Sequence, residues 1–186
     1  MGDISTKAMR TDTGWKDGEA FEIDLVEVRP GVWVSSASAS DWDDAFTEGE
    51  NQGIYPAFDS SFRPMQEQID LWTERMDPAY PGVPKPYMRG TPNAVGKVKG
   101  VAAFPGWSEH QRGEAIDLGF GGDDAAREAF AAIAADHGIV RNVASEHWHF
   151  AWHGIPKLPP FPTWALLIML VVGVSIIGFT ATLLLS

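Results

Sequence analysis

The sequence predicts a small α+β domain followed by one C-terminal transmembrane helix. Three observations support this fold class. Short segments with the alternating apolar pattern of strands are interspersed with longer segments of helical periodicity. All 25 acidic residues and 13 of the 14 basic residues lie before Lys157, as expected of a soluble domain. From Leu158 to Ser186 there is no ionisable side chain, which is typical of a membrane segment.

The composition excludes several function classes. The 186-residue chain has a formal net charge of −11, and residues 1–156 by themselves carry −12. Nucleic-acid binding requires a basic surface, so we expect no nucleic-acid partner. The chain has no cysteine, which excludes disulfides, cysteine zinc ligands and a cysteine nucleophile. The composition gives no indication of the oligomeric state.

The N-terminal half of the chain contains the first strands and two helices. Residues 1–19 are polar and show no hydrophobic periodicity, so we expect a flexible N-terminus. Ser40 and Asp41 are good N-cap residues, and Pro64 is favoured in the first turn of a helix. The expected elements are strands at 21–25 and 32–34, a helix from Ser40 or Asp41 to about Gln52, an extended segment at 55–61 and a helix at 65–76.

The second half of the domain begins with a loop. Residues 77–106 are rich in proline and glycine, which predicts a long irregular loop that can border a functional cleft. Asp123 can cap the following helix, and Gly138 can end it. The remaining elements are that helix at 124–137 and strands at 139–140 and 145–152, which complete a domain at 20–155.

The last segment is predicted to anchor the protein in a membrane. Residues 156–163 form a stiff, proline-rich linker. Residues 164–185 are an uncharged run of 22 residues. As a helix this run is about 33 Å long, enough for a hydrocarbon core of about 30 Å. We therefore expect a single-pass C-terminal anchor in the lipid bilayer; Lys157 by itself does not determine on which side the domain lies.

Two short stretches carry side chains that suit metal chemistry. The first contains His110 and Asp117, and the second contains Glu146 and His149. Two imidazoles and one carboxylate suit Zn²⁺ with a fourth position open for water. Glu146 would then be an acid able to accept a proton from that water. The spacing alone leaves open the alternative that these histidines are structural or exposed.

Strand geometry sets a condition on this hypothesis. In a regular strand over 145–152, the side chains of Glu146 and His149 point to opposite faces. The two side chains converge only if the strand starts or bulges near Glu146.

Three segments of the chain, in order, carry motifs of a known family. Residues 60–68 resemble S-G-Y-R-S-x-x-x-Q, residues 108–117 resemble S-x-H-x-x-G-x-A-x-D, and residues 146–149 resemble E-x-W-H. These motifs are similar to those of the zinc D-alanyl-D-alanine carboxypeptidases, the VanY-like peptidases that include phage L-alanyl-D-glutamate endolysins. The sequence departs from the first motif at Ser61, Phe62 and Pro64, where the family favours Gly, Tyr and Ser.

The resemblance implies a role for each matching residue. His110, Asp117 and His149 would be the zinc ligands, and Glu146 the general base. Arg63 would bind a substrate carboxylate or stabilise the developing oxyanion, because its planar fork suits both tasks. The resemblance also implies a small antiparallel sheet with flanking helices. Ser108 and Gln68 would support the substrate or the fold. Trp148, the remaining residue implied at the substrate site, would pack against its floor.

The implied function is that of a zinc metallopeptidase hydrolysing peptide bonds in peptidoglycan stem peptides. Either a D-Ala–D-Ala carboxypeptidase or an endolysin-like L-Ala–D-Glu endopeptidase fits the motifs. Two alternatives stay open: a non-catalytic zinc-containing module that binds the cell wall, and a membrane-tethered structural protein of a virion or of lysis. The presence of Glu146 favours the enzyme over the binding module.

Overall fold

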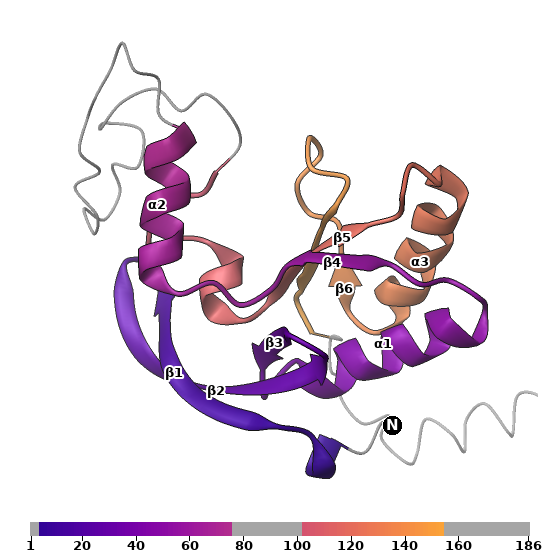
Figure 1. Ribbon diagram of the computed structural model, residues 1–186, viewed down its shortest axis with the longest axis horizontal. Helices are drawn as coiled ribbons and strands as arrows, with labels where there is room; N and C mark the ends of the chain where they lie inside the picture. Colours follow the sequence, from indigo (N-terminus) through magenta and orange to yellow (C-terminus); the bar gives the residue numbers. More distant parts are fainter. Residues whose placement is uncertain (1–3, 76–101, 155–186) are drawn as a thin grey trace, which may run out of the picture. The chain divides into compact units, whose positions relative to one another are not determined.

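The computed structural model describes residues 4–75 and 102–154, which form two small antiparallel sheets with helices around them (Figure 1). The chain divides into two units, Met1–Ile155 and Pro156–Ser186, and the described residues all belong to the first. The predicted linker and membrane helix lie outside the described residues, as does most of the predicted loop. Among residues 4–75 and 102–154, no helix is long and apolar enough to cross a bilayer.

The first sheet has three strands in the order β1-β2-β3, and its hairpin corrects one prediction. We expected no regular structure before residue 20, but β1 (Met9–Lys16) pairs along its whole length with β2 (Glu19–Arg29). Asp17 and Gly18 form the turn, with φ values of 52° and 79° that suit a two-residue hairpin loop. The pattern of β1 gave no strand signal because this edge strand is largely exposed on both faces.

β3 (Val32–Ser35) leads into α1 (Ala39–Asn51), which supplies much of the core. Trp42 and Phe46 of α1 are almost fully buried, and the Phe46 ring stacks on that of Phe130 at 5.7 Å between centroids. Phe130 belongs to α3 (Asp124–Asp136), where the Asp123 side chain caps the helix by accepting from Ala126 N. The predicted helices at 40–52 and 124–137 are thus confirmed to within about a residue.

The second sheet carries the residues of interest. Its strands lie in the order β4-β5-β7-β6, all antiparallel. The register places Asp117 beside Ser60 on one side and beside His149 on the other. Residues of all three predicted motifs therefore lie on neighbouring strands. The strands are β4 (Ala57–Ser60), β5 (Ala115–Gly119), β6 (Ile139–Val140) and β7 (His149–Trp152).

The last strand is shorter than predicted. β7 begins at His149 and not at Ser145, because turns occupy the preceding residues. Backbone hydrogen bonds from Glu146 N to Val143 O and from His149 N to Glu146 O hold these turns. A strand that starts after Glu146 satisfies the condition under which Glu146 and His149 can face one cavity.

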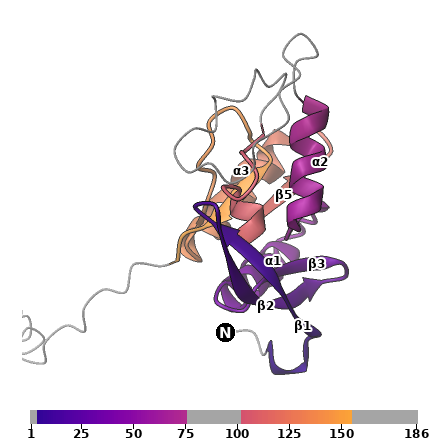
Figure 2. The ribbon, with the colours of Figure 1, turned by 90° about the vertical axis from the view of Figure 1, so that its left-hand side faces the viewer.

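Helix α2 (Met65–Arg75) and the short η3 turn (Glu109–Arg112) lie on the same side of the second sheet (Figure 1). The Trp72 ring of α2 packs edge-on against Phe104, 5.2 Å between centroids. Figure 2 shows the long β1–β2 hairpin running diagonally, below and to the left of α2. At its tip, Gly18 N donates a 3.0 Å hydrogen bond to Gly106 O. The hairpin is thereby joined to the loop that precedes η3.

Candidate active site

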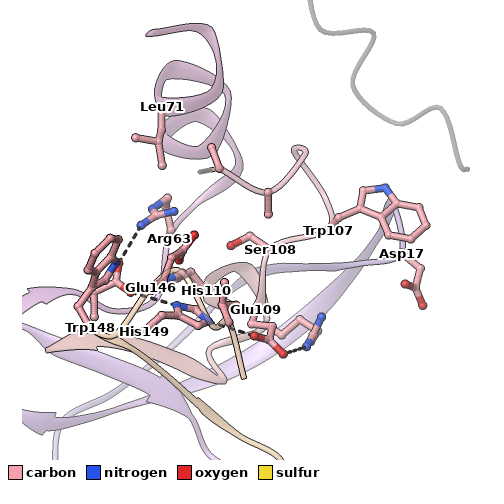
Figure 3. Close-up of a pocket in the computed structure, with 15 residues that line it drawn as sticks. Asp17, Arg63, Leu71, Trp107, Ser108, Glu109, His110, Glu146, Trp148 and His149 are labelled. Carbon is pink, nitrogen blue, oxygen red and sulfur yellow. Dashed lines mark hydrogen bonds and ion pairs between the residues drawn. The ribbon is translucent and has the colours of Figure 1, made fainter. Parts of the chain in front are cut away.

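A pocket of about 520 Å³ lies where η3, β5, α2 and the turn before β7 meet. Figure 3 shows Glu146, His110 and His149 gathered at its base, with Arg63 and Ser108 above them and Trp107 and Asp17 to one side. All of these residues line the pocket. The three sequence motifs, which are up to about 90 residues apart in the chain, therefore converge on one cavity.

Three side chains at the base of the pocket are placed to hold a metal ion. His110, Asp117 and His149 each offer one ligand atom, and these atoms all lie within 4.8 Å of one another. Asp117 Oδ1 is 3.3 Å from His110 Nε2 and 3.0 Å from His149 Nδ1. Both histidines are buried, so the donors are held in a restricted space. Two imidazoles and one carboxylate are a donor set that fits Zn²⁺ and leaves a fourth position for water.

A hydrogen bond to the other ring nitrogen orients each histidine. His110 Nδ1–H donates to Ser61 O at 2.9 Å, and because a carbonyl oxygen only accepts, Nε2 keeps its lone pair for a ligand. His149 Nε2 lies 3.1 Å from Glu109 Oε2, which leaves Nδ1 directed at Asp117. Such outer partners commonly fix the tautomer and the ring orientation of metal-binding histidines.

A glycine between the first two predicted ligands shapes the chain. Gly113 has a φ of +63°, and a Cβ built on it would come within 2.6 Å of Ser35 N. Its carbonyl accepts a 2.8 Å hydrogen bond from that same nitrogen. The backbone of η3 therefore lies directly against β3, and only glycine fits the turn that leads from His110 into β5.

The electrostatics of the cluster favour ionised carboxylates. Burial disfavours the charged form of Asp117, but hydrogen bonds to His110 and His149 outweigh it and hold the pKa of Asp117 well below its usual range. The hydrogen bond to His149 lowers the pKa of Glu109 to about 2, against the opposing effect of burial. Burial opposes the charged form of His149, yet Asp117 and Glu109 raise its pKa to about 9. Both carboxylates are thus held in the form that a cation attracts.

Arg63 is held rigidly at the edge of the cluster. Its Nη1 donates to Gln68 Oε1 at 2.8 Å, its Nη2 donates to Ser60 Oγ at 2.7 Å, and Nη2 lies 3.8 Å from Asp117 Oδ2. Gln68 is fully buried and also donates to Ala103 O at 2.7 Å. Arg63 lines the pocket, whereas Gln68 does not. Gln68 thus holds the guanidinium in place from the buried side.

The remaining predicted residues also lie at the site. Ser108 is buried and Trp148 half-buried, and both line the pocket together with Ala102 and Ala103 at the described end of the predicted loop. The three departures from the first motif, Ser61, Phe62 and Pro64, do not contribute to the pocket lining. Phe62 instead packs in a small core cluster with Ile23 and Leu25.

Sequence reasoning missed two acidic residues of the pocket. Glu109 was not singled out, although it directly precedes His110 and is hydrogen-bonded to His149. Asp17 reaches the pocket from the tip of a hairpin that we did not expect. The Asp-Gly turn was the available signal for Asp17, whereas the pairing of Glu109 with His149 depends on contacts 40 residues apart.

A family model described as VanY, D-alanyl-D-alanine carboxypeptidase, matches residues 32–155. This match spans about two thirds of the chain and includes all three motifs. The chain belongs to this family. The tip of the β1–β2 hairpin precedes the matched residues. Asp17, at this tip, therefore lines the pocket from outside the part of the chain that matches the family model.

Solved structures share the fold. VanYB in complex with D-alanine-D-alanine is 20% identical, with a TM-score of 0.56 over 73% of this chain and 80% of that one. A glutamate-to-alanine variant of VanY from the VanB-type resistance cassette, in complex with Zn(II), is 22% identical, with a TM-score of 0.54 over 72% and 80% of the two chains.

A third structure, the D,D-dipeptidase VanXYg in complex with a D-Ala-D-Ala phosphinate analogue, is 23% identical, with a TM-score of 0.53 over 71% of this chain and 56% of that one. A search of curated proteins gives no match. All three share the fold of this chain, and the descriptions of the first two carry the name VanY.

Proposed function

We propose that this protein is a zinc-dependent peptidase that removes the terminal D-alanine from peptidoglycan stem peptides. The convergence of His110, Asp117 and His149 in a pocket that also contains Glu146 carries the proposal. It is supported by membership of the VanY family and by neighbours in complex with Zn(II) and with D-alanine-D-alanine. The proposal extends to His110, Asp117 and His149 as the zinc ligands.

In the proposed mechanism, the chain's own residues supply proton transfer and substrate orientation. Zinc, when bound, polarises the scissile carbonyl and lowers the pKa of the attacking water. The Glu146 carboxylate accepts the proton of that water and delivers it to the nitrogen of the leaving amine. Ser108 and Trp148 shape the wall against which the peptide lies.

Arg63 is placed to bind a carboxylate next to the scissile bond. A carboxypeptidase substrate ends in a free carboxylate close to the scissile bond, and a rigid guanidinium is a strong partner for such a group. Arg63 lies 3.8 Å from Asp117 Oδ2 and is fixed by Ser60 and Gln68. In an L-Ala–D-Glu bond the D-Glu residue, which is linked onward through its side chain, places its free α-carboxylate in the same position. Arg63 therefore fits either bond, and the preference for terminal D-alanine rests on the family match.

The test is a digest of a stem pentapeptide ending in D-Ala–D-Ala with the zinc-loaded full chain, followed by mass spectrometry. The proposal expects a product shorter by one alanine, together with free D-alanine. Cleavage between L-Ala and D-Glu would assign the endolysin-like activity instead. Binding of the peptide without any cleavage would assign a non-catalytic wall-binding module.

We also propose that residues 164–185 anchor the catalytic domain to a membrane. The support is the uncharged run of 22 residues, which lies outside the described part of the structure. In cell fractionation, the full chain should stay with the membrane pellet in high salt and dissolve in detergent. A Val172→Arg variant places a charge at the centre of the run and should weaken this retention. Recovery of both the wild type and the variant in the high-salt supernatant would contradict the anchor.

A further inference from the structure

A carboxylate outside the metal-binding group holds the third predicted ligand in place. Glu109 Oε2 lies 3.1 Å from His149 Nε2, and Figure 3 shows the two side chains next to each other. The other ring nitrogen of His149, Nδ1, approaches Asp117. The side chain of His149 is 7% exposed and that of Glu109 is 20% exposed, so water competes weakly for this bond. His149 Nε2, the ring nitrogen that is not directed at Asp117, therefore carries a hydrogen and donates it to Glu109.

Glu109 is itself held by three neighbours: Asn142, Arg112 and His153, whose Nε2 lies 3.5 Å from Oε1. Asn142 Nδ2 donates to both of its carboxylate oxygens, at 3.0 and 2.9 Å, and Arg112 Nη2 lies 3.4 Å from Oε1. A carboxylate fixed from three directions has one orientation in which to receive His149. The bond also joins η3, which carries His110, to β7, which carries His149.

The two predicted histidine ligands therefore have unequal support. His110 donates to a backbone carbonyl, that of Ser61, which is neutral. His149 donates to a full negative charge, which makes the opposite ring nitrogen a stronger electron donor. Replacing the outer partner of a metal-binding histidine commonly weakens metal affinity by about 10- to 100-fold.

We propose that Glu109 is a positioning residue that fixes the His149 ring and strengthens Nδ1 as a zinc ligand. This inference rests on the proposed zinc site and deepens it. It does not require any particular peptide bond to be the substrate, so metal binding by itself can test it.

The chain offers a matched control for this role. Glu114 pairs with the same Arg112, at 2.6 Å between Oε2 and Nε, but it contacts neither predicted histidine ligand and does not line the pocket. Glu114→Gln therefore removes one acidic partner of Arg112, as Glu109→Gln does, and leaves His149 unaffected. The comparison separates an effect through His149 from the general loss of a charge at η3.

The experiment measures Zn²⁺ affinity by competition with a chelator, on the full chain at one fixed pH. Glu109→Ala and Glu109→Gln should bind zinc about 10- to 100-fold more weakly than the wild type, with Gln the less affected because its amide oxygen still accepts. Glu114→Gln should stay within about twofold. The visible absorption of the Co²⁺-loaded protein should change in both Glu109 variants and not in the Glu114 variant.

Equal zinc affinity and equal Co²⁺ spectra in the Glu109 and Glu114 variants would overturn the proposal. Circular dichroism identifies a variant that does not fold, and Glu109→Gln, which preserves the shape of the side chain, then decides the question. A wild type that binds zinc tightly but cleaves no stem peptide contradicts the proposed function and leaves the Glu109 comparison intact. A wild type that binds no zinc overturns both.

Discussion

Glu146 lines the pocket beside the metal-binding group without being one of its members. A substitution at this position can therefore separate proton transfer from metal binding. The sequence motif was enough to single out Glu146 and the three predicted ligands. It was not enough to single out Glu109, because nothing in the spacing indicates which neighbour of His110 faces His149.

We predict that Glu146→Gln abolishes most hydrolysis and leaves zinc binding intact. The amide has the size of the carboxylate but cannot accept a proton, and a general base typically contributes about 10²- to 10⁴-fold to the rate. The measurement is kcat on a stem pentapeptide together with zinc content by elemental analysis. Full activity of this variant would contradict the proposed proton transfer by Glu146.

At the scale of elements, close contact between backbones positions the site. η3 lies against β3 through Gly113, and β5 and β7 pair so that Asp117 faces His149. The helices could be predicted from caps and periodicity because these signals are local. The start of β7 and the β1–β2 hairpin could not, because one strand is only four residues long and the other is exposed on both faces.

The contact at Gly113 gives a prediction with an internal control. Gly113 and Gly121 have nearly the same φ, +63° and +61°, but a Cβ meets Ser35 N at 2.6 Å only at Gly113, and nothing within 4 Å at Gly121. Gly121→Ala should cost about 1 kcal/mol of unfolding free energy, from backbone strain alone. Gly113→Ala should cost about 3 kcal/mol or more, because the turn must also shift. Urea denaturation of both variants measures the difference; equal losses would mean that η3 does not need this close approach.

A half-buried ion cluster ties α1 to the N-terminal part of the chain and predicts a pH dependence. Lys7 and Arg29 both contact Asp43. Burial disfavours the charged carboxylate, but these two hydrogen-bonded cations outweigh it and lower the pKa of Asp43 below the ordinary value of 3.8. A lowered pKa contributes stability that is present above the ordinary value and lost as the pH falls through the lowered one.

We therefore expect Asp43→Asn to be less stable than the wild type by about 2 kcal/mol at pH 7, because the half-buried Lys7 and Arg29 lose a charged hydrogen-bond partner, although Arg29 keeps Glu50. The gap should narrow as the pH falls below about 4, since the wild-type carboxyl then also becomes neutral. Thermal unfolding of both proteins between pH 7 and pH 2.5 measures this. A gap that stays constant across the range would show that the charge of Asp43 is not the cause.

For the whole molecule, the proposed metal would add a further link between elements that already contact one another. Its ligands come from η3, β5 and β7, so binding should stabilise the folded chain as a unit. At a free zinc concentration of 100 times Kd, the gain is about 2.7 kcal/mol, which corresponds to a rise in Tm of roughly 5–11 °C for a domain of this size. A chelator should reverse the rise, and His110→Ala should show none. A Tm that does not respond to zinc in the wild type would contradict the metal site.

The sequence by itself determined which motif residues to look for at the site, where the helices lie and which segment has the composition of a membrane anchor. Those signals are local: a motif, a cap, a helical period or an uncharged run is complete within a few residues. Only the tertiary structure decided that Glu146 and His149 face one pocket and that Gln68 holds Arg63 in place. It also decided that Glu109 contacts His149 and that a hairpin outside the family match reaches the pocket. Each of these depends on strand register or on a contact between distant segments, which the packing of the whole domain sets and no local pattern encodes.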